Sequence, residues 1–154
     1  AEGVPVKEVP GVVEIGKAEV IRGYRNNGGR KVALFGLGNM LSVAKQAAVE
    51  LEKDGLDVAI INPRFFKPLD AAVHQFFAGS AEVVGTLEDH VGMGGYGSAV
   101  LELLSEQGIA TPVVRLAWPD VFVEHASTVE YLRERHGLTA QRAGAWPVLN
   151  HTLR

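Results

Sequence analysis

The stretch Lys31-Val32-Ala33-Leu34-Phe35-Gly36-Leu37-Gly38-Asn39-Met40 decides the fold. Val32–Phe35 is a short, wholly apolar run, which is typical of a strand covered on both faces of a sheet. After the turn, apolar residues recur at spacings of three and four, which predicts a helix over residues 39–54. A second apolar run, Val58–Ile61, follows. A strand, a helix and a strand in this order predict a parallel pair.

The same alternation continues along the chain. Further strands are expected at residues 83–87 and 113–116, and further helices at 71–78, after the glycine-rich turn 92–97, at 127–137 and from Thr139. Asn39, Asp70 and Ser127 are expected to cap the starts of three of the helices, and Gly137 is expected to end the helix at 127–137. Upstream, Val12–Ile15 is a strand candidate, and residues 19–22 and 31–35 flank Asn26-Asn27-Gly28-Gly29, which favours a hairpin turn. The sequence therefore predicts an α/β fold in three layers. It has a mostly parallel sheet, helices on both faces and an antiparallel edge strand or hairpin.

Length and composition restrict the classes of protein. The chain of 154 residues suits one domain, and we assign residues 1–11 to a linker and residues 12–154 to that domain. It has no cysteine, and its net charge of −3 gives no reason to expect nucleic acid or a membrane as a partner. These features lead us to expect a cytoplasmic protein. Because the chain begins with Ala1 rather than Met, we also expect it to be either processed or cut from something longer.

Polar and aromatic side chains follow each predicted core strand. In a parallel sheet these positions share one edge, where functional groups gather. The candidate cluster at this edge consists of Asn39, Arg64, Phe65, Phe66, Lys67, Asp70, Glu88, Asp89, His90, Gly94, Gly95, Asp120 and His125. We expect it to serve as an interface or a strand-end cluster.

Each motif in the cluster has alternative interpretations. Gly36-Leu37-Gly38 resembles a dinucleotide turn, but Leu41 replaces the third glycine, so a tight strand-to-helix turn is favoured. The turn Gly92–Gly97 offers N–H groups to an anion, or else lets a helix approach the sheet.

Three further groups of residues also allow more than one interpretation. Glu88-Asp89-His90 allows acid–base chemistry, or else Glu88 or Asp120 pairs with Arg64. Phe65 and Phe66 either pack beneath their loop or dock against another chain. The remaining histidines, His74, His136 and His151, are assigned surface or capping roles.

Several motifs, in order, resemble a known enzyme family. They are Gly36-x-Gly38-x-Met40, Arg64-Phe65-Phe66-Lys67-Pro68-Leu69-Asp70, Thr86-Leu87-Glu88-Asp89-His90, Gly94-Gly95-Tyr96-Gly97-Ser98 and Trp118-Pro119-Asp120-x-Phe122-x-x-His125. Together they resemble the transketolase C-terminal domain of the 1-deoxy-D-xylulose-5-phosphate synthases. Asp89-His90 stands where that family usually has Glu-Asn, and the stretch after Leu138 matches poorly.

The resemblance implies a transferase that joins pyruvate to glyceraldehyde 3-phosphate and supplies isoprenoid, thiamine and pyridoxal synthesis. Thiamine diphosphate and magnesium would be held by preceding domains, so we assign no catalytic, cofactor or metal residue to this chain. The implied partners are those domains and a second copy, in a homodimer that buries part of the loop Arg64–Asp70. The alternatives are a stand-alone module that binds a phosphorylated small ligand at the glycine turn, or part of a protein like a 2-oxoacid dehydrogenase beta subunit.

Overall fold

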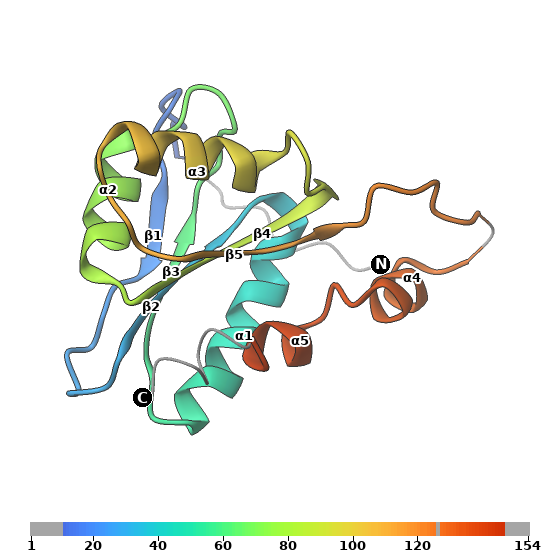
Figure 1. Cartoon of the computed structure of the whole chain (residues 1–154), viewed down its shortest axis with the longest axis horizontal. Coiled ribbons are helices and arrows are strands. Elements are labelled where there is room, and N and C mark those ends of the chain that lie inside the picture. Colours follow the sequence, from blue (N-terminus) through green and yellow to red (C-terminus); the bar gives the residue numbers. More distant parts are fainter. Residues whose placement is uncertain (1–10, 126, 147–154) are drawn as a thin grey trace.

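The structure, a computed structural model, describes residues 11–125 and 127–146. They form a five-stranded sheet in the order β1-β3-β2-β4-β5, with helices on both faces (Figure 1). The strands are β1 (Glu19–Arg22), β2 (Lys31–Gly36), β3 (Asp57–Asn62), β4 (Val83–Val91) and β5 (Val113–Trp118). The helices are the 3₁₀ turn η1 (Gly38–Met40), α1 (Leu41–Lys53), α2 (Ala71–Ser80), α3 (Tyr96–Glu106), α4 (Val129–His136) and α5 (Ala140–Gly144).

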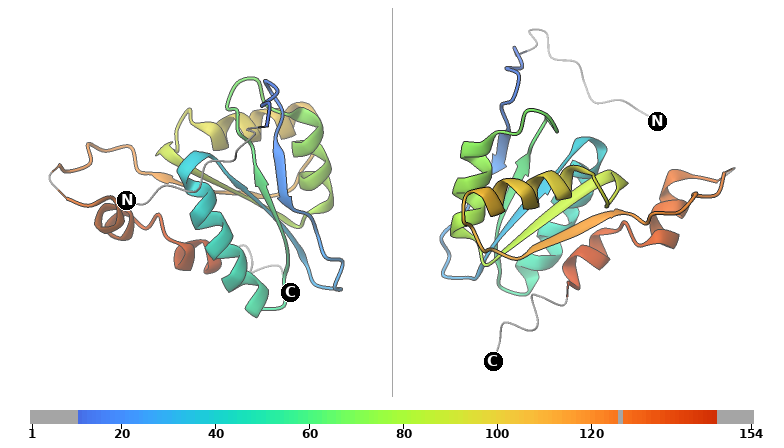
Figure 2. Two further views of the ribbon diagram at one scale, coloured as in Figure 1. Left: turned by 180° about the vertical axis from the view of Figure 1, so that it is seen from behind. Right: turned by 45° about the horizontal axis from the view of Figure 1, so that its top comes forward.

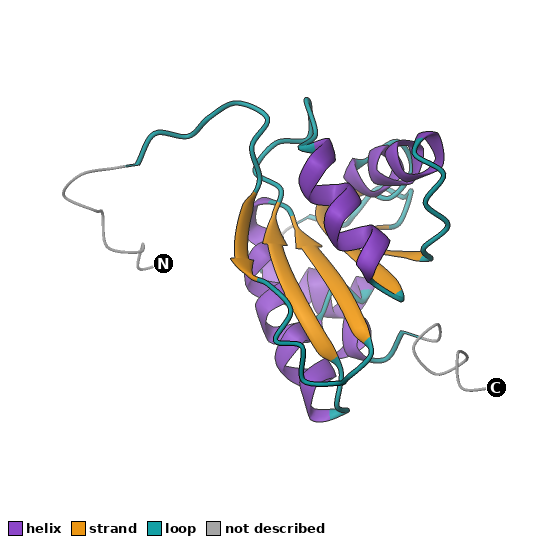
Figure 3. Cartoon of the chain, turned by 90° about the vertical axis from the view of Figure 1, so that its left-hand side faces the viewer, coloured by secondary structure: helices purple, strands orange, loops and turns teal. Residues whose placement is uncertain are grey.

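Strand β2 lies at the centre of the sheet and pairs in parallel with β3 and β4. Its side chains alternate between two apolar clusters, because successive residues of a strand point to opposite faces. Val32 and Leu34 pack beneath α1 and α5, whereas Ala33 and Phe35 pack beneath α2 and α3. Figure 3 shows these helices on the two sides of the sheet. The predicted three-layer α/β fold is confirmed.

The antiparallel strand is at an edge, as expected, but it is not half of a hairpin. β1 pairs with β3, with Glu19 opposite Asn62, and not with the next strand in sequence, β2. The turn uses Asn26 and Gly28 at positive φ, and the buried Asp57 carboxylate accepts the N–H groups of Arg25 and Asn26. The loop therefore carries the chain past the start of β3 into the centre of the sheet.

Three expected details of local structure are wrong. Residues 12–15 do not form a strand, and α4 is capped by Thr128 and not by Ser127. Asn39 does not cap α1, because its side chain donates to Asp89 instead. Asp70 caps α2 as predicted, and α4 ends at Gly137 in the left-handed conformation as predicted.

The last two helices are attached to the sheet in different ways. α5 packs on α1, and the buried Trp146 ring lies over Gly85, where a Cβ atom would overlap the ring. By contrast, α4 has no buried residue. The segment between β5 and α4 projects away from the sheet in both views of Figure 2. Within the described residues, no helix has the length and apolar character needed to cross a membrane.

Replacement of Trp146 tests whether the segment that follows α5 completes the core. We expect Trp146→Ala to lower the free energy of unfolding by about 3–5 kcal/mol, because it leaves a cavity above Gly85. Val49→Ala, at an exposed position of α1, is the control and should change stability by less than about 0.5 kcal/mol. Urea denaturation measures both, and equal effects would contradict this role of Trp146.

Candidate functional site at the carboxyl edge of the sheet

The four parallel strands end at the same edge of the sheet. β2 ends at Gly36, β3 at Asn62, β4 at Val91 and β5 at Trp118. At Gly36 a Cβ atom would lie 2.8 Å from the Leu41 Cα atom, so this glycine allows close packing between β2 and α1. This contact supports the tight strand-to-helix turn rather than a dinucleotide site.

Glu88 is buried at the start of α3. Its carboxylate accepts the backbone N–H of Tyr96 at 2.6 Å and that of Gly97 at 2.8 Å. A carboxylate at a helix N-terminus satisfies free N–H groups and interacts favourably with the helix dipole. The N–H groups that the sequence offered to an external anion are therefore bound to the chain's own Glu88. Gly94 donates to the Ser98 hydroxyl at 3.1 Å, so that N–H is also used internally.

A buried histidine links α2 to α3. His74 was expected at the surface or at a helix cap, but it is fully buried and stacked on Phe35. Its Nδ1 lies 2.7 Å from the Asp70 carbonyl oxygen, which only accepts, so Nδ1 carries the proton. Nε2 then accepts from the Tyr96 hydroxyl at 2.8 Å. Burial lowers the pKa of His74 below its ordinary value of 6.5, and burial raises the pKa of Tyr96.

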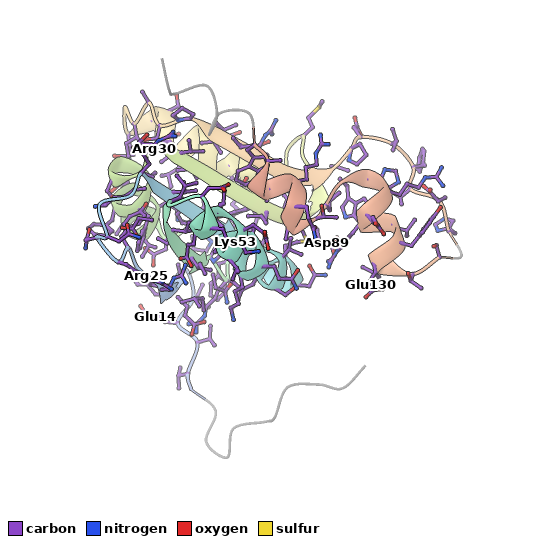
Figure 4. All side chains as sticks on the ribbon, turned by 90° about the horizontal axis from the view of Figure 1, so that it is seen from below. Glu14, Arg25, Arg30, Lys53, Asp89 and Glu130 are labelled. Atoms are coloured by element: carbon purple, nitrogen blue, oxygen red, sulfur yellow. The ribbon has the colours of Figure 1, made fainter. Side chains whose placement is uncertain are left out.

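Asp89 connects four elements of the structure. Its carboxylate accepts from Asn39 of η1 at 2.6 Å, from the Trp118 indole of β5 at 2.6 Å and from Arg133 of α4 at 3.0 Å. Figure 4 shows Asp89 between the body of the domain and α4, the helix that carries Glu130. Partial burial alone would raise the pKa of Asp89, but these hydrogen bonds and the Arg133 charge outweigh it and lower the pKa. Asp89 is therefore an ionised structural anchor for α4.

The loop after β3 does not reach the acidic residues of the edge. Arg64 pairs with Glu19 at 2.9 Å, so the expected pairing with Glu88 or Asp120 is wrong. The reason is that β1 pairs with β3 and brings Glu19 beside this loop. Asp70 accepts the N–H of Val73 at 3.3 Å and that of Ala18 at 3.1 Å, so it caps α2 and also holds the segment before β1.

Phe66 lies between two hollows at this edge. A cavity of about 230 Å³ is lined by Leu37, Phe66, Glu88, His90, Gly94, Gly95 and Tyr96. A second hollow of about 420 Å³ adjoins Phe66 and Lys67 on one side and α3 on the other. Phe65 is half-buried, whereas Phe66 is 46% exposed. The structure thus brings Phe66, Glu88, His90 and the glycine turn together.

Asp120 and His125 are apart from this cluster. Both are exposed on the projecting segment after β5, and within the described residues neither forms a hydrogen bond or an ion pair. Nor do the described residues contain a group of three His, Asp or Glu side chains that could hold a metal ion.

Comparison with known proteins identifies the family. Residues 16–142 match the family described as "Transketolase, C-terminal domain". The chain belongs to the transketolase C-terminal domain family.

The relatives of this transketolase C-terminal domain include whole enzymes. It is 46% identical to a 1-deoxy-D-xylulose-5-phosphate synthase of Methylacidiphilum infernorum (isolate V4), over 92% of this chain and 21% of that synthase. It is 45% identical to the same synthase of Acidobacterium capsulatum, over 92% of this chain and 22% of the relative. The chain thus spans about a fifth of the length of these relatives.

A solved structure is also similar to this domain. It is described as "Split gene transketolase, inactive beta4 tetramer" and is 35% identical, with a TM-score of 0.80. The match covers 96% of this chain and 46% of that chain.

Sequence reasoning missed three functional contacts of the edge. His74, the Trp118 indole and Arg133 were not among the candidates, although each binds a candidate residue or its neighbour. A signal for His74 was present, because Ala71-Ala72-Val73 precede it and Phe76-Phe77-Ala78 follow it closely in an apolar helix. Nothing local in the sequence pointed to the Trp118 or Arg133 contacts.

The buried neutral His74 predicts a pH dependence of stability. The folded pKa is lowered, so stability is complete above pH 6.5 and falls as the pH drops, because the unfolded chain takes up the proton first. Between pH 7.5 and 5.5 the loss due to His74 should reach at most about 1.4 kcal/mol. Urea denaturation of His74→Gln should show a weaker pH dependence than the wild type. His90→Gln, at an exposed position, is the control and should keep the wild-type pH dependence. If the free energy of unfolding varied with pH in the same way for both variants, the pH dependence could not be assigned to His74.

Removal of the Glu88 carboxylate tests the start of α3. We expect Glu88→Ala to lower the free energy of unfolding by about 2–4 kcal/mol, because two buried N–H groups lose their acceptor. Glu88→Gln keeps one acceptor oxygen and should lose less. Glu106→Ala, at the exposed end of α3, is the matched control and should have little effect. If Glu88→Ala unfolded at the same urea concentration as the wild type, this role of Glu88 would be contradicted.

Proposed function

We propose that this chain is the C-terminal domain of a 1-deoxy-D-xylulose-5-phosphate synthase. The observation that carries the proposal is the 46% identity to such a synthase over 92% of this chain. The enzyme would be a cytoplasmic transferase that joins pyruvate to glyceraldehyde 3-phosphate, with loss of carbon dioxide. Its product would supply isoprenoid, thiamine and pyridoxal synthesis.

Within that enzyme the domain has an architectural role. Glu88 binds the start of α3, Asp89 binds α4, and His74 is buried and neutral, so these groups are engaged in the fold. The described residues offer no acidic cluster that fits Mg²⁺ and no free N–H cradle at the glycine turn that fits the diphosphate. We propose that thiamine diphosphate and Mg²⁺ are held by the domains that precede this one in the enzyme.

The proposed partners are those domains and a second copy of the enzyme. Phe66 and Lys67 are exposed beside a hollow lined by both apolar and charged side chains, which suits an interface in which an aromatic side chain is buried on assembly. We propose that the loop Arg64–Asp70 contributes to a homodimer.

The alternative of a module that binds a phosphorylated ligand has less support. A phosphate at the glycine turn would meet the Glu88 carboxylate where it requires free N–H groups. Similarly, the identities to synthases give no reason to prefer a 2-oxoacid dehydrogenase beta subunit.

Exchange of domains tests the proposed function. In the chimera, this chain replaces the C-terminal fifth of the Methylacidiphilum infernorum synthase. We expect the chimera to keep synthase activity that depends on thiamine diphosphate. We expect the same chimera to sediment as a dimer. The isolated chain should show no saturable heat on titration with thiamine diphosphate and Mg²⁺. Micromolar binding by the isolated chain, or a folded dimeric chimera without activity, would overturn the proposal.

A further inference from the structure

We infer that residues 119–125 form a docking arm for the remainder of the longer polypeptide. The inference rests on the proposed function, because it takes this chain to be one domain of a larger enzyme. The docking arm follows β5 and contains the Pro119-Asp120-x-Phe122 part of the last motif, to which the proposed function gives no role.

The tip of the docking arm is apolar and open to water. Phe122 is fully exposed and Val121 is 58% exposed. Nearby on α4, Val129 and Tyr131 are about half exposed. The segment projects from the domain in both views of Figure 2. Adjacent apolar side chains exposed in this way are typical of surfaces that another protein surface covers.

The docking arm is nevertheless fixed at both ends by polar contacts. At its start, Trp118 donates to Asp89 at 2.6 Å. At its end, Glu124 pairs with Arg135 at 2.7 Å and with His136 at 3.2 Å. Arg133 holds the same helix to Asp89. The two ends of the arm are therefore held before a partner binds, which reduces the conformational entropy lost on docking.

Charge around the docking arm selects the kind of partner. Asp120 of the docking arm forms no ion pair within the described residues, whereas Arg133 and Arg135 beside it are paired with acidic residues of this chain. A symmetric contact between two copies would bring the unpaired carboxylates of both arms together, which is unfavourable. The surface fits a different partner, with an apolar hollow and a basic rim.

The remainder of the longer polypeptide is that partner. About four-fifths of the length of the related synthases lies outside the region matched by this chain. A domain joined covalently to its partner is present at a high effective concentration, so a small apolar tip suffices for docking.

Hydrogen exchange on the chimera described above tests this inference. Amide exchange of residues 119–125 should be at least about tenfold slower in the chimera than in the isolated chain. Phe122→Asp should remove the difference. Phe76→Asp is the matched control, because Phe76 is 67% exposed on α2, away from the docking arm, and it should keep the protection. Circular dichroism of the isolated variants checks that each still folds.

Other outcomes overturn the inference in recognisable ways. Equal exchange in the chain and the chimera, or protection that survives Phe122→Asp, excludes docking through this arm. Protection of the isolated chain that rises with its concentration assigns the arm to a second copy instead. An active chimera with an unprotected arm refutes this inference alone, whereas an inactive chimera with a protected arm refutes only the proposed synthase.

Discussion

Strand β2 has no face that water reaches, and the rest of the structure depends on that constraint. Val32, Ala33, Leu34 and Phe35 are all fully buried, so both faces of the sheet must be covered. The chain meets this requirement by crossing over the sheet between parallel strands, with α1 on one face and α2 and α3 on the other. Because β2, β3, β4 and β5 are parallel, they end at one edge of the sheet, and several of the polar residues that follow them lie close together there.

At that edge the polar groups stabilise the domain itself. Glu88 is the N-terminal acceptor of α3, Asp89 anchors α4, and His74 joins α2 to Tyr96. The Asp89 and His74 contacts join elements that are distant in sequence, whereas Glu88 joins β4 to the helix that follows it. Two aromatic side chains outside these contacts stay exposed: Phe66 beside its hollows and Phe122 on the docking arm. This division suits a domain that supports and contacts catalytic domains in the proposed enzyme.

Much of the fold could be predicted because its signals are local. Apolar runs located β2 and β3, and the Asp70 side chain marked the start of α2. Strand pairing is not local, so the turn at Asn26 indicated a reversal without showing that β1 pairs with β3. In the candidate site, too, the sequence identified residues but not the distant residues that they contact. Asp89 was recognisable as a polar residue at a strand end. Its partners come from residues 39, 118 and 133, which only the assembled fold brings together.

The packing of Trp146 has a consequence for synthesis of the protein on the ribosome. Trp146 belongs to the same apolar cluster as Val32 and Leu34, although these residues are far apart in sequence. A chain made from its N-terminus therefore exposes that face of β4 until residues 140–146 have left the ribosome. During this interval the apolar surface around Gly85 is available to chaperones that bind nascent chains. This part of the core therefore depends on residues that are made more than a hundred positions after Val32.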